Sequence, residues 1–298
     1  MLTPNQRRLT MLFSTNTGNL LSQLGAERAL NMIIDAGFPA VDISFYKPSS
    51  DVLSEDYAQT ARKIRHTVES RGAVINQIHA PFSGFDSYVG EIIPTMSRYV
   101  EFAGLLGADV AVVHPIQNGS YYKDREMLRE MNMKFYSSLA PIAKASGVKI
   151  GIENMWKRRP VSNFIDDSVC ADPLELASYY DELSDPDAFT VCLDIGHVAL
   201  CGRDPEYAIE TLGCRIGALH IHDVDYVSDL HTLPGQGKIE WDKVTAALAK
   251  INYSGCFTLE ANNFWAKYDE CLLPDALRFM SRVAKHLSDK LESYKLNL

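Results

Sequence analysis

Two stretches near the middle of the chain follow one plan: "FAGLLGADVAVVH" (residues 102–114) and "IAKASGVKIGIE" (residues 142–153). Each begins with apolar residues at helical spacing, reaches a glycine (Gly107 or Gly147), and continues as a short apolar run. A glycine after a periodic segment is typical of a helix end, and a continuous apolar run is typical of a strand covered on both faces. The two stretches therefore predict a repeated unit of a helix followed by a buried parallel strand.

The same unit recurs from one end of the chain to the other, because segments with helical spacing alternate with short apolar, β-branched runs. The runs predicted as strands are Thr10–Ser14, Ala40–Phe45, Val74–His79, Asp109–His114, Lys149–Glu153, Phe189–Asp194, Ile216–His220 and Cys256–Glu260. The segments predicted as helices lie near Ala26–Ala36, Asp56–Ser70, Glu91–Leu106, Met127–Ser146, Pro173–Leu183, Pro205–Leu212, Trp241–Ile251 and Leu277–Leu291.

Eight strand–helix units in 298 residues are what a (β/α)8 barrel requires. We therefore predict an α/β fold, a single (β/α)8 TIM barrel that forms one domain over residues 1–298. A doubly wound open sheet is the alternative, but that fold usually has a glycine-rich turn after its first strand. The corresponding stretch here, "STNTGNL" (residues 14–20), lacks the GxGxxG spacing.

The composition is ordinary for a globular protein with a full core. The hydrophobic content is 46%, and the net charge of −9 gives no hint of a nucleic-acid or membrane surface. No apolar run approaches the roughly 20 residues of a membrane span, and the first residues contain no signal-peptide core. The six cysteines show no CxxC spacing, which favours free thiols in a reducing compartment. We therefore expect a cytoplasmic protein without membrane attachment.

Acidic and imidazole side chains stand at the ends of six consecutive predicted strands or just after them. They are His79, His114, Glu153, Asp194 with His197, His220 with His222, Asp223, Asp229 and His231, and Glu260. A TIM barrel gathers the carboxyl ends of its strands at one rim, where its active site lies. Carboxylates that converge there repel one another, and a divalent cation would stabilise the cluster. The donors are imidazole and carboxylate without thiolate, a set that suits Mn²⁺, Zn²⁺, Co²⁺ or Fe²⁺.

Five motifs in this order resemble the xylose-isomerase-like TIM-barrel superfamily. They are "GIEN" (151–154), "LDIGH" (193–197), "HIHD" (220–223), the D-L-H-x-x-P-G-x-G-x-I-x-W loop (229–241) and "LEAN" (259–262). The resemblance extends over nearly the whole chain as an order of strands. The superfamily includes sugar isomerases, ketose 3-epimerases, inosose dehydratases, hydroxypyruvate isomerases and endonuclease-IV-type apurinic endonucleases.

The resemblance implies a role for each residue at the rim. It implies that Glu153, Asp194, His220 and Glu260 hold the main metal, that Glu153 and Glu260 form the acid/base pair, and that His197 hydrogen-bonds a substrate oxygen. A metal-dependent isomerase or epimerase is then expected, acting on a sugar, sugar phosphate or sugar acid. The reaction would pass through an enediolate that the metal stabilises while opposed carboxylates move the proton.

Two other functions within the superfamily stay open at this point. The chain has residues at all nine ligand positions of the apurinic endonucleases, so His79, His114, His197, Asp229 and His231 could hold additional metal. However, Leu230 and Thr232 depart from the endonuclease pattern, and no basic loops interleaved with aromatic residues are evident, so nucleic acid is not the expected partner. A dehydratase acting on a cyclitol or sugar acid would share the enediolate chemistry and lose a hydroxide.

Several residues near the strand ends are candidates for contact with a small sugar substrate. They are His79, His114, His222, Trp156 and Trp265. The basic run Lys157–Arg159 follows Glu153 and would either bind an anionic group of the substrate or face solvent. The stretch "PGQG" (234–237) is interpreted as a tight turn that positions His231. A homo-oligomer is compatible with the sequence.

Overall fold

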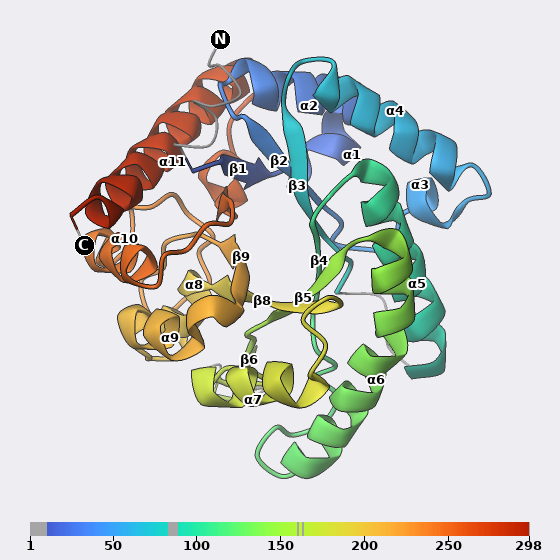
Figure 1. The fold of residues 1–298 in the computed structure, drawn as a ribbon. Coiled ribbons are helices and arrows are strands. Elements are labelled where there is room, and N and C mark those ends of the chain that lie inside the picture. Colours follow the sequence, from blue (N-terminus) through green and yellow to red (C-terminus); the bar gives the residue numbers. More distant parts are fainter. Residues whose placement is uncertain (1–10, 83–88, 160, 163, 298) are drawn as a thin grey trace.

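The barrel wall consists of eight parallel strands, which helices surround (Figure 1). The computed structural model describes residues 11–82, 89–159, 161–162 and 164–297. The strands lie in the order β10-β1-β2-β3-β4-β5-β8-β9. Their bounds are β1 Phe13–Asn16, β2 Ala40–Ser44, β3 Val74–His79, β4 Val110–Val113, β5 Lys149–Glu153, β8 Phe189–Asp194, β9 Ile216–His220 and β10 Phe257–Leu259.

The wall closes just beyond the end of β9, where Ile221 bridges to Leu259 of β10. The Ile221 N–H donates to the carbonyl of Thr258 at 2.9 Å, and the Glu260 N–H donates to the carbonyl of Ile221 at 2.9 Å. With each strand paired on both sides, the sheet forms a barrel. The predicted (β/α)8 fold is therefore confirmed.

Helices form the outer ring of the barrel (Figure 1). The longer ones are α2 Ala26–Asp35, α4 Tyr57–Glu69, α5 Val89–Leu106, α6 Arg125–Ser146, α7 Pro173–Leu183, α9 Pro205–Leu212, α10 Trp241–Lys250 and α11 Leu273–Lys295. Short helices are α1 Leu20–Leu24, α3 Ser50–Leu53, α8 Ile195–Leu200 and the 3₁₀ turns η1 Gly213–Arg215, η2 Asn262–Phe264 and η3 Glu270–Leu272. No helix in the described ranges combines the length and apolar content that a membrane crossing requires.

Local sequence explains where the outer helices begin and end. Before α7, the side chain of Asp172 accepts the N–H of Leu174 at 2.8 Å, and Pro173 occupies the first helical position. An Asp-Pro pair starts α9 in the same way. After α6, Gly147 adopts a left-handed conformation with φ of 66° and ends the helix.

The predicted bounds hold for some elements and shift for others. The strands β3, β5, β8 and β9 and the helices α7 and α9 have the predicted bounds. The first strand is displaced: β1 begins at Phe13, and Leu12 before it is 42% exposed. The predicted start of that strand, Thr10, lies outside the described residues. Helix α11 begins at Leu273 rather than Leu277, because Pro274 favours an early helix start.

An antiparallel ribbon that the sequence did not predict leaves the barrel after β5. Its strands are β6 (Trp156–Arg158) and β7 (Ile165–Asp167). The Lys157–Arg159 run lies on it and is engaged in local contacts. The Lys157 ammonium donates to the carbonyls of Gln117 and Gly119 at 3.2 and 2.8 Å, and Arg159 pairs with Asp166 at 2.6 Å. The ribbon escaped prediction because its strands are three residues long and half-buried.

Between the strands and the helices lies a continuous apolar core, whereas the inside of the barrel is partly polar. One small apolar cluster lies on β4, β8 and β9: Val110, Val112, Cys192 and Ala218. Polar side chains on β1, β2, β3 and β10 are buried as well: Ser14, Asn16, Asp42, Gln77 and Thr258. Because buried polar groups need partners, this interior carries hydrogen-bonded side chains up to the strand ends.

Candidate metal centre and active site

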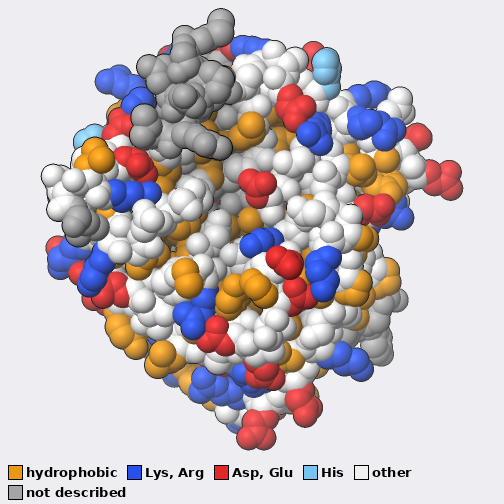
Figure 2. All heavy atoms as spheres, in the orientation of Figure 1, with side chains coloured by type: hydrophobic (Ala, Val, Ile, Leu, Met, Phe, Trp, Pro, Cys, Tyr) orange, Lys and Arg blue, Asp and Glu red, His pale blue; other side chains and the backbone are white. Residues whose placement is uncertain are grey.

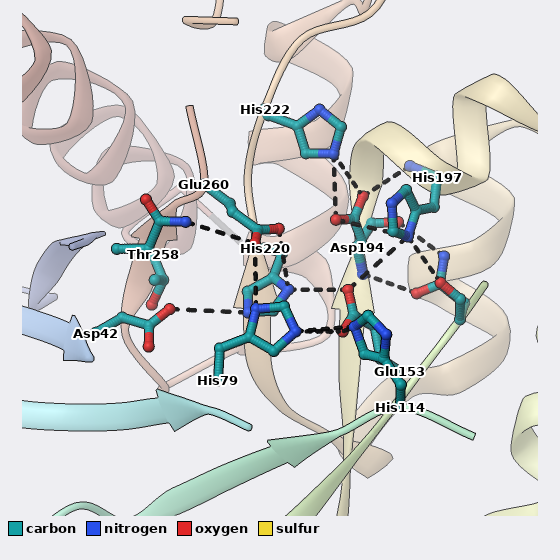
Figure 3. A network of polar contacts seen from close by, with 12 residues as sticks. Asp42, His79, His114, Glu153, Asp194, His197, His220, His222, Thr258 and Glu260 are labelled. Atoms are coloured by element: carbon teal, nitrogen blue, oxygen red, sulfur yellow. Dashed lines mark hydrogen bonds and ion pairs between the residues drawn. The ribbon is translucent and has the colours of Figure 1, made fainter. Parts of the chain in front are cut away.

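Four side chains from the ends of four neighbouring strands meet at one end of the barrel (Figure 3). Glu153, Asp194 and His220 are the last residues of β5, β8 and β9, and Glu260 follows β10 directly. All four are buried, and one ligand atom from each lies within 4.8 Å of the others. Nδ1 of His220 lies 2.9 Å from Oε1 of Glu153 and 3.3 Å from Oε2 of Glu260.

The charge balance of this group depends on imidazole. Burial would raise the pKa of Glu153, but His220 and His114 hold it well below the usual range. The same holds for Glu260, whose pKa His220, His79 and His231 lower against the effect of burial. Three buried carboxylates with one imidazole at such distances form a donor set that fits a divalent ion. Protonated histidines and a bound cation would offset the same negative charge.

A second group of donors, His197, His222, Asp229 and His231, lies beside the first, again with ligand atoms within 4.8 Å. The Nε2 atom of His231 lies 3.0 Å from Oδ2 of Asp229, and its ring stacks on that of His222 with centroids 4.0 Å apart. Oδ1 of Asp229 is buried and has no hydrogen-bond partner. His231 has a φ of 42°, in the left-handed region that residues other than glycine rarely adopt.

The electrostatic environment favours a positively charged His231. Burial would lower the pKa of this imidazole, but the hydrogen bond to Asp229 and the charges of Glu260 and Asp229 raise the pKa to about 10. Burial would raise the pKa of the Asp229 carboxyl, but the neighbouring imidazoles of His231 and His197 lower it. The two residues therefore form an ion pair at the edge of the site.

Asn154, to which the sequence analysis gave no role, holds Asp194 and His197 in place. The side chain of Asn154 donates to the carbonyl of Asp194 at 2.9 Å and accepts its N–H at 2.8 Å. Asp194 in turn caps the unpredicted helix α8, because its Oδ1 accepts the N–H of His197 at 2.7 Å. Nδ1 of His197 lies 2.9 Å from the carbonyl of Asn154. In the sequence, the signal for this role was an asparagine that directly follows the glutamate at the end of a strand.

His79 and His114 connect the two glutamates. Nδ1 of His79 lies 3.2 Å from Oε1 of Glu260, and its Nε2 lies 2.8 Å from Nε2 of His114. The same nitrogen of His114 lies 2.8 Å from Oε2 of Glu153. Burial lowers the pKa of His114 despite that carboxylate. With Glu153, these histidines form a third cluster of donors within 4.8 Å.

A cavity of about 360 Å³ opens at this end of the barrel. Both glutamates line it, together with His79, His114, His197, Asp229 and His231. Phe82 and Trp156 form part of the wall, and the Phe82 ring stacks on that of His114 with centroids 4.9 Å apart. Lys and Arg are absent from the described residues that line the cavity.

Two residues expected to contact substrate, Trp265 and His222, are absent from the lining of this cavity. Trp265 is buried in the apolar core, where its ring packs over Gly18. His222 is fully buried, and its Nε2 lies 3.2 Å from Oδ2 of Asp194. Neither is among the residues that line the cavity, so their contact with a substrate stays a prediction. His222 instead belongs to the second donor cluster, with His197, Asp229 and His231.

On the face of the molecule that the space-filling view shows, Lys and Arg are interspersed with Asp and Glu, and the described residues form no continuous basic surface there (Figure 2).

The family described as "Xylose isomerase-like TIM barrel" matches residues 30–283 of the chain. A crystal structure of a D-tagatose 3-epimerase-like protein superimposes with a TM-score of 0.71 at 21% identity, covering 94% of this chain and 99% of that one. D-psicose 3-epimerase with D-tagatose, from Clostridium cellulolyticum H10, gives a TM-score of 0.72 at 16% identity and covers 93% and 99%. At these identities the likeness establishes the fold alone.

Several curated proteins are related to this chain in sequence. The uncharacterized protein MJ1311 of Methanocaldococcus jannaschii is 29% identical over 196 residues, which cover 62% of this chain and 64% of that protein, just under two thirds of its length. The uncharacterized protein ML2432 of Mycobacterium leprae is 26% identical, covering 86% and 92%. An inosose dehydratase of Bacillus cereus is 31% identical over 97 residues, covering 27% of this chain and 33% of the enzyme.

Proposed function

This chain belongs to the xylose isomerase-like TIM barrel family, and from this premise we propose that it is a divalent-metal-dependent isomerase or epimerase of a small, uncharged sugar. One observation carries the proposal. Glu153 and Glu260, from strands separated by β8 and β9 around the barrel, face one cavity while sharing a donor cluster with Asp194 and His220. Two opposed carboxylates beside a cation site are what proton transfer next to a carbonyl requires.

In this proposal Glu153, Asp194, His220 and Glu260 hold the ion. The ion would act as a Lewis acid and stabilise the negative charge of an enediolate. The chemistry of the donors supports Mn²⁺, Zn²⁺, Co²⁺ or Fe²⁺. Glu153 and Glu260 of this cluster line the cavity together with the aromatic rings of Phe82 and Trp156, so a substrate that enters would meet these two carboxylates.

The two glutamates would move the proton. Their lowered pKa values keep both carboxylates ionised at neutral pH, so either one can accept a proton from the carbon next to the substrate carbonyl. In an isomerisation the same carboxyl returns that proton to the neighbouring carbon. In an epimerisation the opposite glutamate would take a proton from solvent and deliver it to the other face of the carbon, and the first glutamate would release the abstracted proton to solvent. His197 also lines the cavity, where it would hydrogen-bond a hydroxyl of the substrate.

The lining of the cavity supports an uncharged sugar over a sugar phosphate or sugar acid. A volume of about 360 Å³ lies near the lower end of the roughly 300–1,000 Å³ of small-molecule sites. A phosphate there would face Glu153, Glu260 and Asp229 without a lysine or arginine among the described lining residues. The nearby Lys157 and Arg159 are engaged in contacts of their own. Burial of an unpaired anion beside carboxylates is costly.

Specific observations favour two alternative functions. The extra donor clusters around His231 and His79 would fit a multinuclear zinc site of an apurinic endonuclease. The match over 97 residues to an inosose dehydratase favours loss of water from a cyclitol. The small cavity, which has no lysine or arginine among its described lining residues, counts against the endonuclease.

One experiment separates these functions. Metal-free protein is reloaded with Mn²⁺, Co²⁺ or Zn²⁺ and assayed on ketoses, the matching ketose phosphates, an inosose and duplex DNA with an abasic site. We expect turnover of a ketose, with one deuterium from D₂O incorporated at carbon as measured by NMR. Cleavage of the DNA without ketose turnover would overturn the proposal, and so would water loss from the inosose as the dominant reaction.

A further inference from the structure

Asp42, in the middle of β2, has one carboxylate oxygen without a partner although the residue is fully buried inside the barrel. Its Oδ2 accepts the side-chain N–H of Gln77 at 3.3 Å, whereas Oδ1 has no hydrogen bond. Buried polar atoms in native proteins nearly always have partners, so an exception calls for an explanation.

His220 has the complementary deficit. Its Nδ1 faces the two glutamates, at 2.9 Å from Glu153 and 3.3 Å from Glu260. Its other ring nitrogen, Nε2, is buried and has no hydrogen-bond partner. This nitrogen lies 3.9 Å from Oδ2 of Asp42 (Figure 3). The imidazole thus presents one nitrogen to the carboxylates of the proposed metal centre and the other to Asp42.

We infer that Asp42 is a positioning residue that orients His220 as a metal ligand and fixes its tautomer. The inference rests on the proposed function, because it needs a cation at the four-residue cluster. When Nδ1 gives its lone pair to a cation, the ring proton must reside on Nε2, which then becomes a donor. A carboxylate that accepts this proton holds the ring in place and makes the ligand more basic.

The gap between the two residues is small enough to close. The separation of 3.9 Å is about 1 Å longer than a hydrogen bond of roughly 2.7–3.2 Å. A modest rotation of either side chain would therefore join them. Because Oδ1 of Asp42 is unpartnered, a rotation of the carboxylate breaks no hydrogen bond at that oxygen.

The strands that carry the pair are irregular beside each residue. The register between β2 and β3 shifts between Val41 and Asp42, and that between β8 and β9 shifts at Gly217, three residues before His220. Such bulges re-aim side chains and are frequent next to active sites. Gly217 is required there, since a Cβ atom would lie 2.3 Å from Oγ1 of Thr190.

Cys192 is the rival partner for His220. Its buried thiol also interacts with the imidazole, but a thiol is a weak hydrogen-bond acceptor. Cys192→Ala is therefore the matched control, because it removes a neighbour of the same ring from the same interior while leaving Asp42 in place.

The test compares wild type, Asp42→Asn, Cys192→Ala and His220→Ala as metal-free proteins titrated with Co²⁺, with affinity read from visible absorption and chelator competition. We expect Asp42→Asn to weaken Co²⁺ binding by about 10–100-fold and to alter the Co²⁺ spectrum, while Cys192→Ala binds like wild type. The melting temperature of each metal-free variant establishes that it is folded, and Asp42→Ala serves as the second variant.

The possible outcomes test the role of Asp42, the metal centre and the proposed reaction separately. Wild-type affinity in both Asp42 variants, or weakening by Cys192→Ala instead, overturns the role of Asp42 and leaves the metal centre standing. No binding by wild type, or unchanged affinity in His220→Ala, overturns the metal centre and this inference with it. Binding that depends on Asp42 in a protein that turns over no ketose supports this inference and contradicts the proposed reaction.

Discussion

The indole N–H of Trp241 donates a hydrogen bond of 2.9 Å to Oδ2 of Asp223, and this bond ties the first residue of α10 to the segment that follows β9. The same oxygen accepts the N–H of Gly235 at 2.8 Å, and Oδ1 accepts those of Val224 and Ile239 at 3.0 and 3.1 Å. One buried carboxylate thus gathers the loop of residues 224–240, which carries Asp229 and His231. Asp223 closes the "HIHD" motif and was expected at the rim with the other strand-end residues, but its hydrogen bonds to this loop were not predicted.

Asp223→Asn should destabilise the protein and loosen this loop. An amide has a single acceptor oxygen, so some of the four N–H donors would lose their partner. Each buried donor left unsatisfied costs about 1–3 kcal/mol. We expect a lower free energy of unfolding in urea and faster proteolytic cleavage within residues 224–240.

Trp241→Phe is the control for this change, because it removes one hydrogen bond and keeps the ring packed. Its effect should be near 1 kcal/mol, clearly below that of Asp223→Asn. Equal stability of wild type and Asp223→Asn would contradict the organising role of this carboxylate.

Glu260→Gln should abolish proton transfer with only a modest loss of metal. The amide keeps an oxygen that can contact a cation but cannot accept the proton, and acid–base catalysis is worth about 10²–10⁴-fold in rate. Deuterium exchange at the substrate carbon, followed by NMR with Mn²⁺ replaced by diamagnetic Zn²⁺, measures the step directly. Glu270→Gln, at an exposed position, should exchange at the wild-type rate. Near-wild-type exchange in Glu260→Gln would remove this residue from the mechanism.

Much of the candidate site was predictable from the sequence, because the topology of a barrel alone brings the strand ends to one rim. Glu153, Asp194 and His220 end strands whose continuous apolar runs fixed their bounds, and the structure brings their side chains together with that of Glu260. The predicted roles of these residues await the experiments above.

Side-chain direction was not predictable in the same way. Where both faces of a strand are buried, the apolar pattern does not distinguish the inside of the barrel from the outside. Asp42 in "AVDIS" was therefore passed over, although an aspartate in the middle of a buried run was a signal. The orientation of the Trp265 ring was not predictable either, because the rotation of a ring after a strand end depends on tertiary packing, here against Gly18.

Removal of the metal should lower stability as well as activity. Three buried carboxylates lie in the donor cluster, and a ligand that binds the native state alone stabilises it by about 2.7 kcal/mol at a hundred times its Kd. The melting temperature should fall by several degrees on chelation and recover on addition of Mn²⁺, Co²⁺ or Zn²⁺. His220→Ala should show little of this recovery. A melting temperature that does not respond to chelation in a fully demetallated sample would count against a resident ion.

Lys157→Ala should leave the KM for a ketose unchanged. The ammonium donates to the backbone carbonyls of Gln117 and Gly119, at 3.2 and 2.8 Å, so its charge supports the loop after β4 rather than a ligand. We expect a small loss of thermal stability and equal kinetics on the neutral sugar. Arg159→Ala, which breaks the ion pair with Asp166, is the matched variant on the same ribbon. Steady-state assays with a ketose and its phosphate decide the matter: a phosphate preferred by wild type, and lost in Lys157→Ala, would show that this basic run binds an anionic substrate.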